Sequence, residues 1–188
     1  MTSGPVSADA TMSVARANAI ALLWLPVSAI LSAVPFLLLW GYDRLAAAPP
    51  RLPSILPSLA LMGLLVLVHE LLHAAGFLLI ARAPRGQVHV GFQRRTLTPF
   101  ATCRVPVTAA AYRAAGVLPA LVLGGLPVLV AWATGSATLL LWGWFMLALA
   151  GGDVAAIWAM RRVPAGALVE DDPARVGCRV VRQRPAED

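Results

Sequence analysis

The sequence predicts an all-α membrane protein with four transmembrane helices and a cytoplasmic β-hairpin between the second and third helices. Hydrophobic residues make up 59% of its 188 residues and charged residues 13%, with a mean hydropathy of +0.76, which excludes an ordinary soluble domain. Only one long polar connection, from Arg82 to Tyr112, interrupts the apolar sequence. Four apolar stretches are long enough to cross a bilayer, at about 18–42, 54–81, 114–132 and 137–160.

The arginines predict how these helices are oriented. All fifteen basic residues are arginine, which hints at a GC-rich bacterial genome, and thirteen of them lie in the segments 1–17, 82–113 and 161–188. Cytoplasmic segments of membrane proteins carry an excess of basic residues. We therefore expect a bacterial plasma-membrane protein with cytoplasmic tails at 1–17 and 163–188 around a membrane domain at 18–162. The net charge of +6 is assigned to topology, and no nucleic-acid partner is expected.

The first apolar stretch is expected to be a retained membrane helix. Three alanines at 46–48 could imitate a signal-peptidase site, but the apolar core exceeds that of a signal peptide and only one arginine precedes it. Pro26 and Pro35 are expected to kink this helix. In the third stretch, Pro119, Pro127 and the glycines at 124–125 are features that membrane helices tolerate when their neighbours pack closely.

The long connection is predicted to form the hairpin. Polar and apolar residues alternate over 87–92 and, less regularly, over 100–105, and Pro99 stands where it costs no ladder hydrogen bond. His89 is expected at an exposed strand position and not as a metal ligand. Another small strand is expected at 178–181. Cys103 and Cys178 have neither metal-site spacing nor disulfide density, so both are expected to be free thiols facing the cytoplasm.

His69, Glu70 and His73 form the motif that predicts chemistry. At helical spacing the two histidines stand one turn apart on the same face, so two imidazole nitrogens can converge on one metal ion. This is the pattern of zinc hydrolases, in which the adjacent carboxylate takes a proton from water and returns it to the leaving amine. A buried structural histidine pair is the alternative, but it would not explain a third ionisable group, Glu70, within the membrane.

Asp153 is the predicted third ligand, because catalytic zinc normally takes three protein ligands. It is the only other acidic or basic side chain in the four predicted spans. His73 precedes Arg82 by nine residues and Asp153 precedes Arg161 by eight, so at about 1.5 Å per residue both lie roughly 12–14 Å inside the membrane. Gly151 and Gly152 are expected to let the fourth helix approach the second. Asp153 either binds the metal directly or holds a ligand imidazole.

Several strings together resemble a bacterial domain-of-unknown-function family of zincin peptidases, over about 54–181. They are His69-Glu70-Leu-Leu-His73, Gly151-Gly152-Asp153, Val163-Pro-Ala-Gly-Ala-Leu-Val, Asp172-Pro and Val176-Gly-Cys178. More distantly, the layout is similar to the site-2 protease clan of intramembrane zinc metalloproteases. The resemblance implies that His69, His73 and Asp153 bind zinc and that Glu70 is catalytic. It supplies no oxyanion-stabilising residue, because the central spans contain no asparagine and no Leu-Asp-Gly string.

The expected function is a zinc metalloprotease that lies in the lipid bilayer and cuts membrane-associated polypeptides near the cytoplasmic leaflet. The alternative is a non-enzymatic accessory or regulatory membrane protein in which zinc locks the second and fourth helices together. Glu70 favours the enzyme, since a structural zinc site gains nothing from an adjacent acid. An extended substrate is expected to pair with the hairpin edge at Val88 or Val90, unless the hairpin merely caps the bundle.

Overall fold

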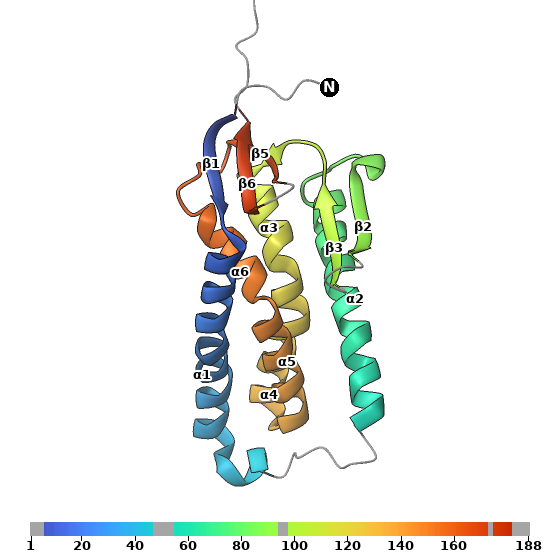
Figure 1. Cartoon of the computed structure of the whole chain (residues 1–188). Helices are drawn as coiled ribbons and strands as arrows, with labels where there is room; N and C mark the ends of the chain where they lie inside the picture. The colour runs from blue at the N-terminus through green and yellow to red at the C-terminus, as the bar shows by residue number, and fades with distance from the viewer. Residues whose placement is uncertain (1–5, 47–54, 94–97, 173–174, 182–188) are drawn as a thin grey trace, which may run out of the picture.

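The protein is mostly helical, with two small β-sheets at the same end of a helix bundle (Figure 1). The computed structural model describes residues 6–46, 55–93, 98–172 and 175–181. In chain order the elements are β1 (Val6–Met12), α1 (Val14–Ala46), α2 (Ile55–Leu79), η2 (Arg85–Gln87), β2 (Val88–Gln93), β3 (Thr98–Cys103), β4 (Val107–Thr108), α3 (Ala109–Pro119), η3 (Ala120–Gly125), α4 (Leu126–Thr134), α5 (Ala137–Leu149), α6 (Gly151–Ala159), β5 (Leu168–Asp171) and β6 (Val176–Val181).

Within the described residues, three helices are long and apolar enough to cross a membrane: Val14–Ala46, Leu56–Leu79 and Ala109–Thr134. The pair α5 and α6 makes a fourth if it is counted as one span, but it is bent by 41° around Ala150. The prediction of membrane-spanning helices is thus supported, and the four-span topology stays a prediction. Helix α1 continues through both of its prolines, and its non-helical residue is Gly41, with φ 76° and ψ 171°.

The two segments expected to be tails contribute three strands, of which β1 and β5 were not predicted. Strand β1 pairs antiparallel with β6, and the four-stranded sheet has the order β1-β6-β5-β4. The strand predicted at 178–181 is confirmed within β6. The sheet packs on the end of the bundle around a core that buries Cys103 and Cys178, which are 1% and 0% exposed. Among the described residues neither cysteine forms a disulfide, as expected, but both thiols are buried and not exposed to solvent.

The predicted hairpin is present as β2 and β3, paired antiparallel from Val88 opposite Cys103 to Gln93 opposite Thr98. Residues 94–97, between the two strands, lie outside the described residues. The Arg104 N–H donates to the Gln87 carbonyl. Because hydrogen-bonded pairs alternate along an antiparallel ladder, the N–H groups of Ala101 and Cys103 point away from β2.

Two other hairpin expectations can be compared with this register. Pro99 occupies one of the outward positions of β3, so its missing N–H removes no bond to β2, as the sequence predicted. His89 is half-buried opposite Thr102, where an exposed position was expected.

The break between α5 and α6 positions Asp153, the acidic residue in the first turn of α6. At the bend, the Leu147 carbonyl accepts a hydrogen bond from the Trp24 indole N–H of α1 at 2.7 Å, in place of a donor within the helix. A Cβ on Gly151 would lie 2.9 Å from the Ala21 Cα, so this glycine lets α6 pack closely against α1. The expectation that Gly151 and Gly152 bring the fourth helix onto the second is therefore wrong, and Gly152 faces open space. The Arg113 guanidinium donates to the Met160 and Val163 carbonyls, which fixes the other end of α6.

Candidate metal centre

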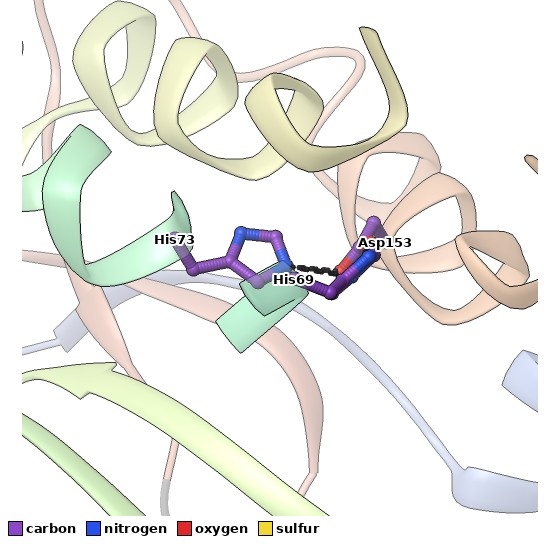
Figure 2. Close-up of side chains that lie close together, drawn as sticks. All are labelled: His69, His73 and Asp153. Atoms are coloured by element: carbon purple, nitrogen blue, oxygen red, sulfur yellow. Dashed lines mark hydrogen bonds and ion pairs between the residues drawn. The ribbon is translucent and has the colours of Figure 1, made fainter. Parts of the chain in front are cut away.

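His69, His73 and Asp153 converge as the sequence predicted, two from α2 and one from the first turn of α6 (Figure 2). The two Nε2 atoms of the histidines lie 3.2 Å apart. Asp153 Oδ2 lies 3.1 Å from His69 Nε2, and Oδ1 lies 3.1 Å from His73 Nε2. Both imidazoles are buried, at 5% and 9% exposure. Side chains of α2 and α6 thus meet at the same level along the two helices, as the sequence predicted.

The separations fit a tetrahedral zinc site. Zinc bound to nitrogen and oxygen at about 2.0–2.1 Å holds its ligand atoms about 3.3–3.4 Å apart. The three observed separations are 0.1 to 0.3 Å shorter than this, and the two that involve Asp153 end on different oxygens of its carboxylate. The Asp153 carboxylate also faces the Nε2 atoms of His69 and His73, the same two atoms that lie close to each other. A carboxylate that merely oriented a ligand imidazole would be expected at the opposite ring nitrogen.

The opposite nitrogen of His73 is held by the backbone of α3. His73 Nδ1 lies 3.0 Å from the Ala115 carbonyl, and since a carbonyl only accepts, Nδ1 carries the proton. In the neutral form of this tautomer, Nε2 would offer its lone pair to a metal ion. In a regular helix the Ala115 carbonyl would accept from residue 119, but Pro119 has no N–H. The proline thereby frees an acceptor for the histidine.

A glycine allows that contact. A Cβ on Gly76 would lie 2.7 Å from the Ala115 Cα, so only glycine lets α2 pack this closely on α3. His69 has no equivalent support: among the described residues its buried Nδ1 has no hydrogen-bond partner. His89 and the two cysteines do not belong to the cluster.

Glu70, His73 and Asp153 line one pocket of about 170 Å³, and His69 lies behind them without lining it. The pocket lies between α2, α3, α6 and the outer edge of β3, whose Ala101 amide faces the Glu70 carboxylate. Apolar walls come from Phe77, Phe100 and Ile157. Glu70 is thus placed beside the three converging side chains without being one of them, as the motif predicted.

Tyr112 and Asp171 line the same pocket and were missed as site residues. The Tyr112 hydroxyl donates to Asp171 Oδ1 at 2.5 Å, and the Cys103 N–H donates to Asp171 Oδ2 at 2.9 Å. Burial raises the pKa of the Asp171 carboxyl above its ordinary value, and these two hydrogen bonds oppose that effect. In the sequence, Asp171 was one acid among several in an expected tail, and only the pairing of β5 and β6 brings it to the pocket.

A family model described as "Putative zincin peptidase" (DUF3267) matches residues 62–168, more than half of the chain. This range contains His69, Glu70, His73 and Asp153. No curated protein and no solved structure matched. By the family match, the chain belongs to this zincin peptidase family.

Proposed function

We propose that the protein is a zinc metallopeptidase of the bacterial plasma membrane that hydrolyses membrane-associated polypeptides near the cytoplasmic leaflet. The observation that carries this proposal is the meeting of two histidine Nε2 atoms and an aspartate carboxylate, at a pocket that Glu70, His73 and Asp153 line. His69, His73 and Asp153 would hold the ion. A family of zincins implies zinc, and two nitrogens and one oxygen are a ligand set that catalytic zinc uses.

Glu70 is the residue assigned to proton transfer. Zinc bound by these three residues would supply a Lewis acid that polarises the scissile carbonyl and makes water more acidic. Glu70 takes one proton as the water oxygen bonds to the carbonyl carbon, and it delivers that proton to the nitrogen as the carbon–nitrogen bond breaks. His73 keeps its Nδ1 proton throughout, because the Ala115 carbonyl holds it. The second proton of the water also passes to the nitrogen, so the products are a carboxylate and a primary ammonium.

An apolar groove supports a substrate that arrives from the lipid. The groove has a volume of about 620 Å³ and lies between α2 and α5, with Leu59, Val66 and Leu149 among its walls. Pro99 of β3 lines both this groove and the metal pocket, so the two are neighbours. Apolar side chains of a membrane-embedded segment would bury favourably in such a groove.

The non-enzymatic alternative makes a different prediction for the same purified protein. In that alternative the ion would only join α6 to α2. The test is zinc content measured together with cleavage of a panel of single-span membrane proteins. Cleavage that a chelator abolishes and added zinc restores supports the peptidase. Stoichiometric zinc with no cleavage of any panel member, and unfolding on chelation, would favour the structural role.

We further propose that an extended substrate pairs with the edge of β3. The substrate was expected to pair at Val88 or Val90, which lie on the edge of β2. The hairpin residues that line the metal pocket belong to β3 instead. Among the described residues β3 pairs with β2 alone, and the Ala101 N–H points outward beside Glu70. A peptide strand added there would run past the proposed proton carrier.

Replacing Ala101 with proline should reduce cleavage by up to about tenfold, the effect of losing one strand hydrogen bond in the bound state. Zinc content should stay at the wild-type level. Val90→Pro is the matched control, because Val90 lies directly opposite Ala101 and its N–H points to the far edge of the hairpin. Initial cleavage rates and metal analysis decide the comparison. Equal rates for the two variants would leave the hairpin a structural role only.

The proposed orientation needs a labelling test at surface positions, since burial shields both native thiols and raises the pKa of Cys103. Gly86 and Gly166 are exposed at the end of the bundle that carries the sheets, and Thr134 is exposed at the end of α4. An impermeant maleimide should label Thr134→Cys in intact cells and should label Gly86→Cys and Gly166→Cys only after lysis. The reverse pattern would invert the topology.

A further inference from the structure

Tyr112 and Asp171 form one end of the metal pocket and take no part in the hydrolysis described above. They reach the pocket from α3 and β5, and a third element, β3, contributes the Cys103 N–H that also binds Asp171. The Tyr112 ring packs edge-on against Phe77 of α2, with the ring centroids 5.6 Å apart. Four elements thus fix the position of the hydroxyl.

The direction of the hydrogen bonds determines what the hydroxyl can offer. Asp171 receives a donor on each oxygen, which is the pattern of an ionised carboxylate. A phenol has one proton, and that of Tyr112 is donated to Asp171. Only lone pairs of the phenol oxygen remain for a ligand, so it can accept from an N–H group but has no proton to give to an oxyanion. The adjacent carboxylate polarises the phenol and makes its oxygen a stronger acceptor.

The charges around the pocket favour a positive ligand. Its described lining includes three acids, Glu70, Asp153 and Asp171, and no arginine. A divalent ion in the centre would offset the charges of Asp153 and Glu70, which leaves the charge of Asp171 without a cation. In contrast, the neighbouring Asp172 forms an ion pair with Arg179. Buried charges are normally paired.

We propose that Tyr112, with Asp171 as its positioning residue, binds the amino group of the fragment released by peptide hydrolysis, a primary ammonium. This inference rests on the proposed function. When the carbon–nitrogen bond breaks, the nitrogen gains its proton from Glu70 and becomes an amine whose pKa, about 7.7–8.0, makes it largely protonated at neutral pH. Tyr112 accepts from this N–H group, while Phe77 and Ile157 offer apolar surface to the adjoining side chain.

The test measures binding and requires no hydrolysis. Leucyl-leucinamide, which has a free amino group, and its N-acetyl derivative are titrated into zinc-loaded protein in detergent and followed by calorimetry. The free amine should bind wild type at least tenfold more tightly than the acetylated peptide. Tyr112→Phe should lower this preference about tenfold, which is the effect of one hydrogen bond to a charged group. The affinity for the acetylated peptide should stay unchanged.

Two further variants separate positioning from fold. Asp171→Asn should also lower the preference, because its amide can donate to the phenol oxygen and occupy the acceptor. Asp172→Asn is the matched control and should keep the preference. Tyr112→Phe retains the ring that packs on Phe77, so its fold is expected to persist, and thermal unfolding checks it.

Each outcome bears on one proposal. Equal affinities of the two peptides for wild type, or an unchanged preference in Tyr112→Phe, would overturn the inference even if the protein hydrolyses peptides. A preference that depends on Tyr112, in a protein that cleaves no member of the substrate panel, would support this binding site and count against the peptidase.

Discussion

Replacing Glu70 with glutamine is expected to abolish peptide hydrolysis while zinc content and fold stay at wild-type levels. Glutamine has nearly the same shape but takes up no proton, and general acid–base catalysis contributes about 10²–10⁴-fold to such rates. Glu70 lines the pocket but is not among the three side chains whose ligand atoms converge. The loss should therefore appear in the rate and not in metal binding.

Initial rates of substrate cleavage and metal analysis on the same preparation measure this. Glu170→Gln is the matched control, because Glu170 lies one residue before Asp171 on β5 and does not line the pocket. It should cleave as wild type does. Cleavage by Glu70→Gln at the wild-type rate would show that the peptidase proposal is wrong. A loss of zinc in Glu70→Gln would instead assign Glu70 to the metal site.

The helices and the metal cluster could be predicted because their signals are local or rare. Length and apolarity identify membrane spans without any knowledge of packing. Histidines four residues apart on a helix must share a face. Asp153 was found because ionisable groups are scarce inside the predicted spans, and a common depth selected it. Each of these predictions needs only a single segment of the chain and the rise of a helix per residue.

The remaining features depend on contacts between distant segments. Strand β1 pairs with β6, more than 160 residues away in sequence, and β1 carries too weak a pattern to predict a strand by itself. The bend at Ala150 has no proline to announce it. Asp171 reaches the pocket only through that sheet. One sequence signal was available: Pro119 in a helix leaves the Ala115 carbonyl without its donor, which marked a free acceptor on the third span.

Replacing Asp153 with alanine is expected to lower zinc affinity by more than about 100-fold, because removal of a residue that only supports a ligand already costs about 10–100-fold. Asp153 lies 3.1 Å from each histidine Nε2, so in the proposed site it would supply the third protein ligand and the only negative charge among the three. Its loss leaves two neutral imidazoles, which hold zinc less tightly than a three-ligand site.

Zinc competition titrations with a chromophoric chelator on detergent-purified protein measure the affinity directly. Asp171→Ala and Asp172→Ala are controls that should retain wild-type zinc binding, because neither carboxylate belongs to the cluster. Thermal unfolding of metal-free samples shows whether the variant still folds, since alanine also removes the acceptor that faces both Nε2 atoms. Wild-type zinc affinity in Asp153→Ala would exclude it as a ligand. A loss of only about tenfold would assign it the supporting role.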